Sequence, residues 1–443
     1  MCGRDAPLDA IGRLAAFIDR SPTPFHAVSE LSARLGGAGF GQIDEGDEWS
    51  LTPGSRCYVT KDDGTLVAFS VGRAAPAETG FVVLAAHTDS PGLRLKPLPD
   101  LQGPAYHQLA VEVYGSPLWY TWLDRDLGIA GRVCDREGST HLVRLDGPAC
   151  VIPSLAIHLN REVNTLGLQL NAQQHINPIW RLRPDGATLA EVLAAELTTN
   201  LSRSFAPDDI LAFDLCLFED QPTSVVGPDR DLLCGSRLDN LLSCHAVLEA
   251  LLASPATTNR TQVGVFYDHE EVGSRSSSGA HSRFVLTTLE RIASTGGTAP
   301  QAGPRAFARS LLVSVDMAHG VHPNWADKHD SQHRPVLGAG PVIKSHASQA
   351  YATGAPATAA AVRACHAAGF TPQRFASRND LVCGSTVGPI TSARLAMPAV
   401  DLGNPMLAMH SSREVAATAD VHKLVDALSE VLRADRTPRS ALP

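Results

Sequence analysis

Five short stretches of the sequence end an apolar run with a side chain that can bind a metal ion. They are Ala86-His87-Thr88-Asp89, Leu238-Asp239-Asn240, Asp268-His269-Glu270-Glu271, Val315-Asp316-Met317 and Ala408-Met409-His410. Imidazole and carboxylate groups together suit a pair of divalent ions held close to each other, and zinc is the usual ion for this mixture of ligands. The sequence therefore predicts a metal centre assembled from segments that lie far apart in the chain.

The candidate ligands can be divided between two ions. Asp239 would bridge the pair by giving one oxygen to each ion, although an acid at the start of a helix can also simply stabilise the helix dipole. One ion would be completed by His87 and Asp316, and the other by Glu271 and His410. Two ions about 3.5 to 4 Å apart are used by aminopeptidases, phosphatases and nucleases. The pattern favours metal-assisted hydrolysis.

Two further carboxylates lie beside these ligands in the sequence. Asp89 follows His87 by two residues and can accept the second N–H of a ligating imidazole. Glu270 precedes Glu271, and adjacent side chains at a strand end diverge, so one can bind metal while the other faces the reacting water. The glutamate that faces the water could take and return its proton in the hydrolysis.

The ligands require elements that bring them to one place. Four apolar runs are continuous rather than alternating, as in parallel strands that are buried on both faces. These runs are Phe81 to Ala86, Val263 to Tyr267, Leu311 to Val315, and Pro398 to Leu402. Binding sites of open α/β sheets gather at the carboxyl ends of the strands, so ligands that follow separate strands can meet there.

Segments whose apolar residues recur with helical periodicity separate these strands. They are Asp239 to Ala253, Ala355 to Ala368 and Val421 to Leu432. Residues 93–233 instead contain short alternating segments with turn residues between them. We expect an α/β fold, a three-layer mixed-sheet domain formed by residues 1–92 and 234–443. Residues 93–233 would be an inserted β-rich domain. Residues 294–303, rich in glycine, are expected to form a surface loop.

Composition narrows the class of protein. The chain has 443 residues, of which 44% are hydrophobic and 19% charged, and a net charge of −9. This balance predicts a globular protein without a nucleic-acid or membrane partner. We find no secretory signal or membrane-length apolar run, so we expect a cytoplasmic location. The nine cysteines contain no C-x-x-C pair, so we expect reduced thiols rather than disulfides or a cysteine zinc site.

Several motifs together resemble one known family. They are Ser21-Pro22-Thr23-Pro24-Phe25-His26-Ala27, Ala86-His87-Thr88-Asp89-Ser90-Pro91, Ile152-Pro153-Ser154-Leu155-Ala156-Ile157-His158-Leu159, Glu270-Glu271-Val272-Gly273-Ser274, Asp316-Met317-Ala318-His319 and Leu407-Ala408-Met409-His410-Ser411. In matching order, from near residue 9 to about residue 434, the chain is similar to the aspartyl aminopeptidase family of dizinc metallopeptidases. The resemblance implies a metallopeptidase domain that binds two zinc ions, for which cobalt or manganese can substitute.

The resemblance also implies a role for individual residues. Glu270 matches the general base of the family, and Asp89 matches the acid that orients a ligand. The zinc ligands of the family fall on His87, Asp239, Glu271, Asp316 and His410. Lys344 matches the position that reads an acidic substrate side chain in aspartyl members, although most lysines are ordinary surface residues. An acidic substrate approaching a chain of net charge −9 needs such a local positive group.

The resemblance extends to the assembly. His158 matches a histidine of the inserted domain that reaches the active site of a neighbouring subunit and stabilises the tetrahedral intermediate. The family forms tetrahedral dodecamers, so the resemblance implies a homododecamer here. The residues themselves would have suggested only a strand histidine without a function.

The expected function is release of N-terminal Asp or Glu from peptides. Arg275 stands where some relatives carry an acidic residue, and the family includes enzymes that prefer neutral residues, so a Leu-type aminopeptidase of the same fold stays open. A dinuclear phosphoesterase and a non-catalytic assembly protein are further alternatives. A local excess of histidines, whose spacing matches no zinc finger and no H-E-x-x-H helix, is interpreted as residues of loops around the site. These are His319, His322, His329, His333 and His346.

Overall fold

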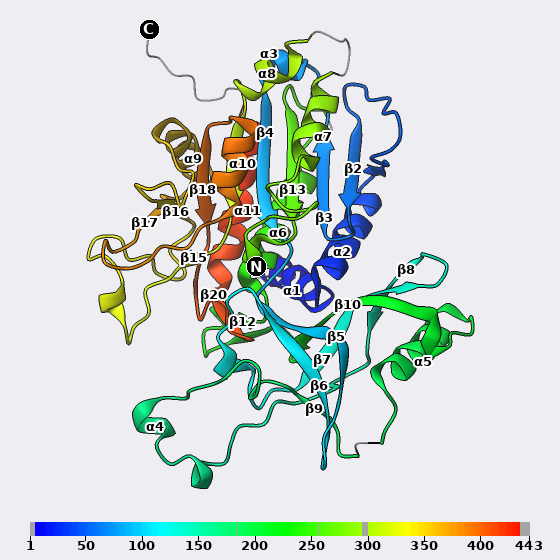
Figure 1. The fold of residues 1–443 in the computed structure, drawn as a ribbon. Coiled ribbons are helices and arrows are strands. Elements are labelled where there is room, and N and C mark those ends of the chain that lie inside the picture. Colours follow the sequence, from blue (N-terminus) through cyan, green and yellow to red (C-terminus); the bar gives the residue numbers. More distant parts are fainter. Residues whose placement is uncertain (1–4, 184, 256, 295–299, 435–443) are drawn as a thin grey trace.

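The computed structural model describes residues 5–183, 185–255, 257–294 and 300–434. A nine-stranded mixed sheet forms the centre of the fold (Figure 1). In spatial order its strands are β1 (Gly41–Gln42), β2 (Arg56–Lys61), β3 (Thr65–Ser70), β13 (Thr261–Tyr267), β4 (Phe81–His87), β14 (Leu311–Val315), β18 (Ala399–Gly403), β16 (Val342–Ser345) and β17 (Gln373–Ala376). β4 pairs in parallel with β13 and β14, and β14 pairs in parallel with β18. The four strands predicted from continuous apolar runs are therefore confirmed, to within two residues at each end.

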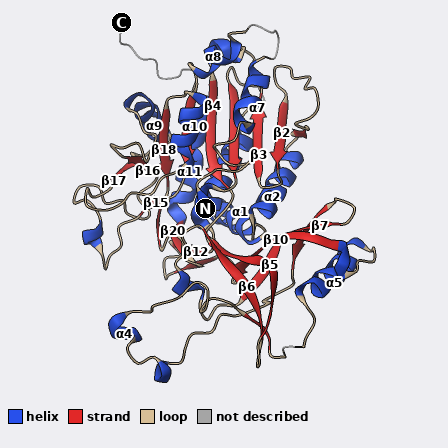
Figure 2. Ribbon diagram, in the orientation of Figure 1, coloured by secondary structure: helices blue, strands red, loops and turns tan. Residues whose placement is uncertain are grey.

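Both faces of this sheet are covered, which explains the continuous apolar runs. Successive residues of β4 alternate between two cores, with Val82 and Leu84 in one and Val83 and Ala85 in the other. The first core is closed by α1 (Asp5–Asp19), α2 (Pro24–Gly37), α6 (Leu238–Ala253), α9 (Ala355–Ala367) and α11 (Thr418–Arg433). The second is closed by α7 (Phe284–Ala293), α8 (Ala302–Phe307) and α10 (Val387–Leu395). The predicted three-layer α/β architecture is confirmed (Figure 2).

A second sheet of six strands lies at the carboxyl end of the central strands (Figure 2). Its order is β8 (Thr140–Arg144), β7 (Leu127–Asp135), β10 (Ile210–Glu219), β5 (Gly92–Gln102), β6 (His107–Tyr114) and β9 (Ile179–Arg181). With α5 (Leu189–Leu201) it encloses a separate hydrophobic core. A long irregular segment between β8 and β9 carries a turn of 3-10 helix at Ile157–Leu159 and the short α4 (Val163–Leu166).

A third sheet joins the two regions. Its strands are β11 (Ser224–Val226), β12 (Leu232–Gly235), β20 (Glu414–Ala417), β19 (Pro405–Leu407) and β15 (Ala318–His319). β12 pairs with β20, so residues before position 234 share a sheet with the C-terminal part of the chain. The boundaries 1–92, 93–233 and 234–443 stay a prediction.

The helices predicted from periodicity correspond to α6, α9 and α11. Residues 295–299 of the expected surface loop lie outside the described residues, and α8 begins within its last part. The short α3 (Pro76–Thr79) packs beside α8.

The eight cysteines that the structure describes are free thiols. No helix among the described residues is long and apolar enough to cross a membrane, while the cytoplasmic location stays a prediction.

Candidate metal centre

The carboxyl ends of the central strands bring the candidate ligands together. His87 is the last residue of β4, and Asp316 directly follows β14. Glu271 lies in the 3-10 turn Glu270–Val272 after β13, and Asp239 lies in the first turn of α6. His410 follows β19 in a turn with positive φ, which the preceding Ala408 shares. Adjacent strand ends of the central sheet thus collect His87, Glu271 and Asp316, while α6 and the loop after β19 contribute Asp239 and His410.

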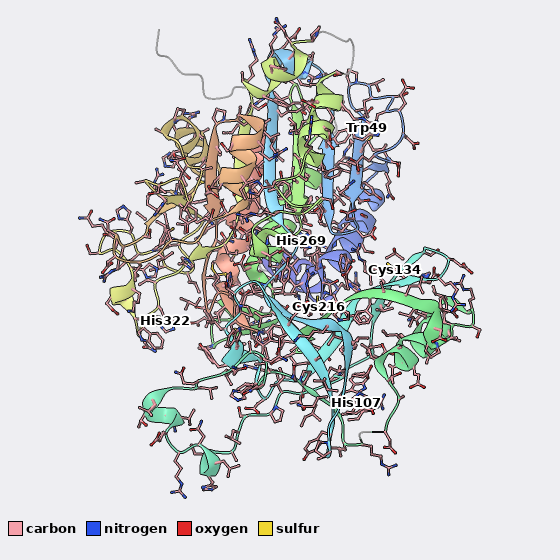
Figure 3. All side chains as sticks on the ribbon, in the orientation of Figure 1. Trp49, His107, Cys134, Cys216, His269 and His322 are labelled. Carbon is pink, nitrogen blue, oxygen red and sulfur yellow. The ribbon has the colours of Figure 1, made fainter. Side chains whose placement is uncertain are left out.

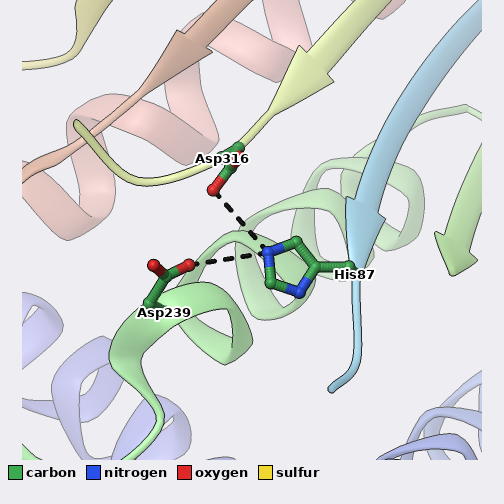
Figure 4. A group of neighbouring side chains, drawn as sticks. All are labelled: His87, Asp239 and Asp316. Atoms are coloured by element: carbon green, nitrogen blue, oxygen red, sulfur yellow. Dashed lines mark ion pairs between the residues drawn. The ribbon is translucent and has the colours of Figure 1, made fainter. Parts of the chain in front are cut away.

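One group of ligands surrounds the ring of His87. Its Nε2 lies 3.6 Å from Asp239 Oδ1 and 3.7 Å from Asp316 Oδ1 (Figure 4). All three side chains are buried. Ligand atoms that are each about 2.0 to 2.2 Å from a tetrahedral zinc ion are about 3.3 to 3.6 Å from one another, so the group has suitable dimensions for one ion.

A second group shares Asp239 with the first. The Nε2 atom of His410 lies 3.6 Å from Asp239 Oδ2 and 3.6 Å from Glu271 Oε1. Asp239 therefore turns one carboxylate oxygen toward each group. This is the division of ligands that the sequence predicts, and the roles of these residues as ligands stay a prediction.

Both imidazoles are oriented by their other ring nitrogen. Nδ1 of His87 lies 3.0 Å from the carbonyl oxygen of Asp89 and 3.3 Å from its carboxylate. Nδ1 of His410 lies 3.1 Å from the carbonyl oxygen of Ser116, in the chain that follows β6. When Nδ1 carries the proton in each ring, Nε2 is left with its lone pair facing the carboxylates.

Asp89 holds the loop that carries Glu270 and Glu271. It is fully buried, and its two carboxylate oxygens each accept a backbone N–H at 3.1 Å, one from Glu270 and one from Glu271. The hydroxyl of Tyr114, at the end of β6, donates a third hydrogen bond to Asp89 at 2.7 Å. The six-stranded sheet therefore contacts the metal centre directly.

Glu414 is a residue of this site that sequence reasoning missed. It is 1% exposed at the start of β20, and it accepts the backbone N–H of Asp239 at 3.0 Å and that of His410 at 2.7 Å. One signal was present in the sequence, because Glu414 opens the apolar strand Glu414-Val415-Ala416-Ala417 only four residues after His410. A carboxylate at the start of such a strand must be satisfied by polar partners if it is buried.

The charges of the site are unbalanced without a cation. Burial, with the nearby like charges of other carboxylates, raises the pKa of Glu270 to about 8 and the pKa of Glu271 well above its usual range. Burial opposes the charged form of the two imidazoles, but carboxylate contacts outweigh it and raise the pKa of His410 to about 10 and that of His87 well above 6.5. Divalent cations would supply the missing positive charge and release these protons.

The donor set also fits zinc. Asp239 Oδ1 is buried without a hydrogen-bond partner among the described residues, although Asp239 is the residue that both groups share. A buried carboxylate oxygen of this kind requires compensation, which a coordinated ion provides. Two imidazoles and several carboxylates are nitrogen and oxygen donors that zinc accepts.

Two of the predicted site residues are not members of these ligand groups. Lys344, on β16, is 2% exposed, and its Nζ donates a hydrogen bond to the carbonyl oxygen of Met317 at 2.9 Å. Its Nζ also lies 3.7 Å from Asp316 Oδ2, so it borders the first group of ligands. His158 is exposed on the irregular segment before α4, which extends away from the three sheets in the ribbon view (Figure 1). Within the described residues of one chain, His158 does not join the ligands.

A pocket of about 290 Å³ lies beside the His410 loop. Its walls contain Phe375 and the segment from Met406 to Met409, and three histidines of the local excess, His319, His322 and His329, line it as well. Figure 3 labels His322 on a loop at the periphery of the chain, and His269, which precedes Glu270, near the junction of the sheets. The segment from Met406 to Met409 therefore places this pocket next to the loop that carries His410.

Comparison with known proteins agrees with this geometry. Residues 17–431 match the family described as aminopeptidase I zinc metalloprotease (M18). The probable M18 family aminopeptidase 2 of Ectopseudomonas mendocina (strain ymp) is 44% identical over 439 residues, 97% of this chain and 99% of its own length.

Solved structures give the same result. The cryo-EM structure of the Ape4 and Nbr1 complex matches with a TM-score of 0.93 and 34% identity, over 97% of this chain and 86% of that one. The S. cerevisiae mApe1 dodecamer matches with a TM-score of 0.82 and 25% identity, over 98% of each chain. The fold, the ligand geometry and these matches together show that the chain belongs to the M18 family of zinc aminopeptidases.

Proposed function

We propose that this M18 aminopeptidase releases N-terminal residues, preferably Asp or Glu, from peptides with a pair of zinc ions. The observation that carries the proposal is the sharing of Asp239 between two groups of ligands, one around His87 and one around His410. A bridging carboxylate is what two adjacent ions require. Family membership favours a peptidase over the phosphoesterase and the non-catalytic assembly protein.

Glu270 is the proposed general base. Bound zinc ions would supply Lewis acidity, which polarises the scissile carbonyl and lowers the pKa of a coordinated water. Glu270 lies in one group with His87 and Glu271, so its carboxylate is close enough to take the proton of the attacking water. Burial raises the pKa of Glu270 to about 8, and nearby cations would lower it toward neutrality, where a base both accepts and returns a proton efficiently. Glu270 would then deliver the proton to the departing amine.

His158 is the proposed second contributor, and it would act in a neighbouring subunit. Its segment exposes large apolar side chains, which is costly for an isolated chain and typical of a surface that another protein covers. These include Leu155 at 62%, Ile157 at 48%, Leu159 at 75% and Leu166 at 70% exposure. The similarity to the mApe1 dodecamer supports self-association, for which we propose a homododecamer. The inserted domain, residues 93–233, would then serve as lid and oligomerisation surface.

The proposed preference for an acidic residue has two supports. Lys344 places a positive charge 3.7 Å from Asp316, at the border of the metal centre. None of the described residues that line the pocket beside His410 is a carboxylate. Lys328 lines it, as does Arg378, although the guanidinium of Arg378 is already paired with Asp380. An acidic side chain would therefore meet positive charge and little repulsion.

One observation favours the alternative, a neutral-residue aminopeptidase. The ammonium of Lys344 already has a hydrogen-bond acceptor in the carbonyl of Met317, and it is almost fully buried. The pocket also has apolar walls, formed by Phe375, Leu381 and Met409 among others. Such a pocket would accept a leucine side chain.

The test is hydrolysis of Asp, Glu, Leu and Lys anilides by the purified protein, first after chelation and then after adding zinc, cobalt or manganese. Cleavage that depends on metal and favours Asp or Glu is the expected result. Cleavage that favours Leu would keep the metal mechanism and replace the acidic preference by the alternative. Absence of cleavage with every metal would contradict the proposed activity.

A further inference from the structure

We propose that Glu414 is a positioning residue of the metal centre, which ties the backbone of Asp239 to the backbone of His410. The inference rests on the proposed two-ion centre and adds to it a residue that binds no ion itself. Glu414 would set the separation of two ligands of the second ion, the one completed by Glu271.

The contacts of Glu414 link two distant parts of the chain. Its Oε2 accepts the N–H of Asp239, which lies 175 residues earlier, and its Oε1 accepts the N–H of His410. Both bonds are charge-assisted when the carboxylate is ionised, and at 1% exposure no bulk water competes for its oxygens. A single rigid side chain therefore joins the first turn of α6 to the loop after β19.

The two groups of ligands depend on Glu414 to different extents. His87 is the last residue of β4, and the N–H of Asp316 is bonded to the carbonyl of Leu402 in β18, so the central sheet itself fixes these ligands. His410 lies on a loop instead, and Asp239 has non-helical dihedral angles within α6. Loss of Glu414 should therefore weaken the second ion more than the first.

Asp89 provides an internal parallel. It too is fully buried, and its two oxygens accept the N–H groups of Glu270 and Glu271. Two carboxylates outside the proposed ligand set thus hold the three segments on which Asp239, Glu271 and His410 lie. Groups that orient ligands in this way change metal affinity by about 10- to 100-fold when they are replaced.

The decisive variant is Glu414→Gln, which keeps the size of the side chain. A glutamine has one acceptor oxygen, and its NH₂ group would face a backbone N–H donor, so one of the two bonds must be lost. The matched control is Glu219→Gln. Glu219 is also buried, at 4% exposure, and is paired with Arg413 rather than with the backbone of a ligand.

The experiment is calorimetric titration of the metal-free proteins with Zn²⁺, together with the melting temperature of each metal-free protein. The wild type should bind two ions. Glu414→Gln should bind one of them at least about tenfold more weakly and the other nearly as before, while Glu219→Gln should keep both affinities. In a Glu271→Gln background, which already lacks a ligand of the second ion, adding Glu414→Gln should change the affinity of the remaining ion by no more than about twofold.

Each other outcome is informative. Unchanged affinities in Glu414→Gln, with or without a lower melting temperature, would overturn the inference and leave Glu414 a purely structural residue of β20. Equal weakening of both ions, or equal effects of Glu414→Gln and Glu219→Gln, would overturn it as well. A wild type that binds fewer than two ions would instead refute the two-ion centre on which the inference rests.

Discussion

Glu270 and Glu271 are neighbours in sequence, and the structure gives them different surroundings. Glu271 lies with Asp239 and His410, while Glu270 belongs only to a group with His87 and Glu271. The backbone N–H groups of both are bonded to Asp89, so neither side chain is free to exchange places with the other. The proposed division of roles, with Glu271 as ligand and Glu270 as base, would therefore depend on the loop that Asp89 holds.

Replacing Glu270 by Gln should lower kcat by about 10²- to 10⁴-fold, because an amide cannot accept and return the proton of the attacking water. The binding of zinc should stay close to that of the wild type. Steady-state kinetics and zinc titration of the same preparation measure both quantities. Glu271→Gln is the matched comparison and should lose metal affinity as well as activity. A Glu270→Gln enzyme with near wild-type kcat would remove Glu270 from the proposed role.

Replacing Lys344 by Leu should lower kcat/KM for Asp and Glu substrates by about 10- to 100-fold, the range expected for losing a charged hydrogen bond, and should spare Leu substrates. Lys423→Leu is a suitable control, because its Nζ is also bonded to a backbone carbonyl, that of Gly338, and Lys423 lies on α11 outside the candidate ligand groups. If Lys344→Leu changes the rates for acidic and neutral substrates equally, Lys344 does not read the substrate side chain.

At the scale of elements, α6 both presents Asp239 and packs against α1. His245 of α6 is 1% exposed, and its ring lies 5.9 Å from that of Phe17. Burial lowers the pKa of His245 to about 3, and the positive charges of Arg34 and Arg13 act in the same direction. Its nearest carboxylate oxygen belongs to Glu249, at 3.8 Å. The imidazole is therefore neutral in the folded chain over most of the pH range.

A histidine with a lowered pKa in the folded state costs stability as the pH falls. Below about pH 6.5 the unfolded chain binds a proton that the folded chain does not, and this difference grows until the folded pKa is reached. At pH 5 the loss from His245 should be about 2 kcal/mol. Urea unfolding of metal-free wild type and His245→Leu between pH 7.5 and pH 5 measures it, and the variant should lose less stability. Parallel losses in both proteins would contradict a neutral, buried His245.

At the scale of the whole molecule, the described part of one chain does not bring the proposed catalytic groups together. Glu270 lies at the metal centre, whereas His158 is exposed on the segment before α4 (Figure 1). If a second copy supplies His158, activity should depend on assembly, and the two defects should be separable between chains. Symmetric oligomers commonly build sites at subunit interfaces in this way.

His158→Ala and Glu270→Gln should each be nearly inactive alone, since loss of one group that stabilises the oxyanion costs about 10²- to 10³-fold. Co-expressed with different affinity tags and purified through both, the two variants should regain about a quarter of the wild-type activity, the share of sites that combine an intact Glu270 with an intact His158. Mixing the purified variants without subunit exchange is the negative control. A mixed oligomer as inactive as its parents would show that His158 does not act across the interface.

The sequence by itself predicted the types of side chain that meet at the candidate site and determined the core that carries them. Continuous apolar runs such as Phe81 to Ala86 can be satisfied only in a sheet covered on both faces, and helical periodicity located α6, α9 and α11. The residues directly after those strands could then be expected to meet at their carboxyl ends, which holds for His87 and Asp316. These inferences needed only local patterns and one general rule of α/β topology.

The tertiary structure decided what depends on contacts between distant segments. The bonds of Glu414 to Asp239, of His410 to Ser116 and of Lys344 to Met317 each join residues whose own neighbourhoods in sequence do not reveal the partner. Their formation is set by how whole elements pack, because a side chain can satisfy a buried charge only with the groups that packing places beside it. For this reason the convergence of the candidate ligands, with Asp89 beside them, could be predicted from the sequence, whereas the contacts of Glu414 could not.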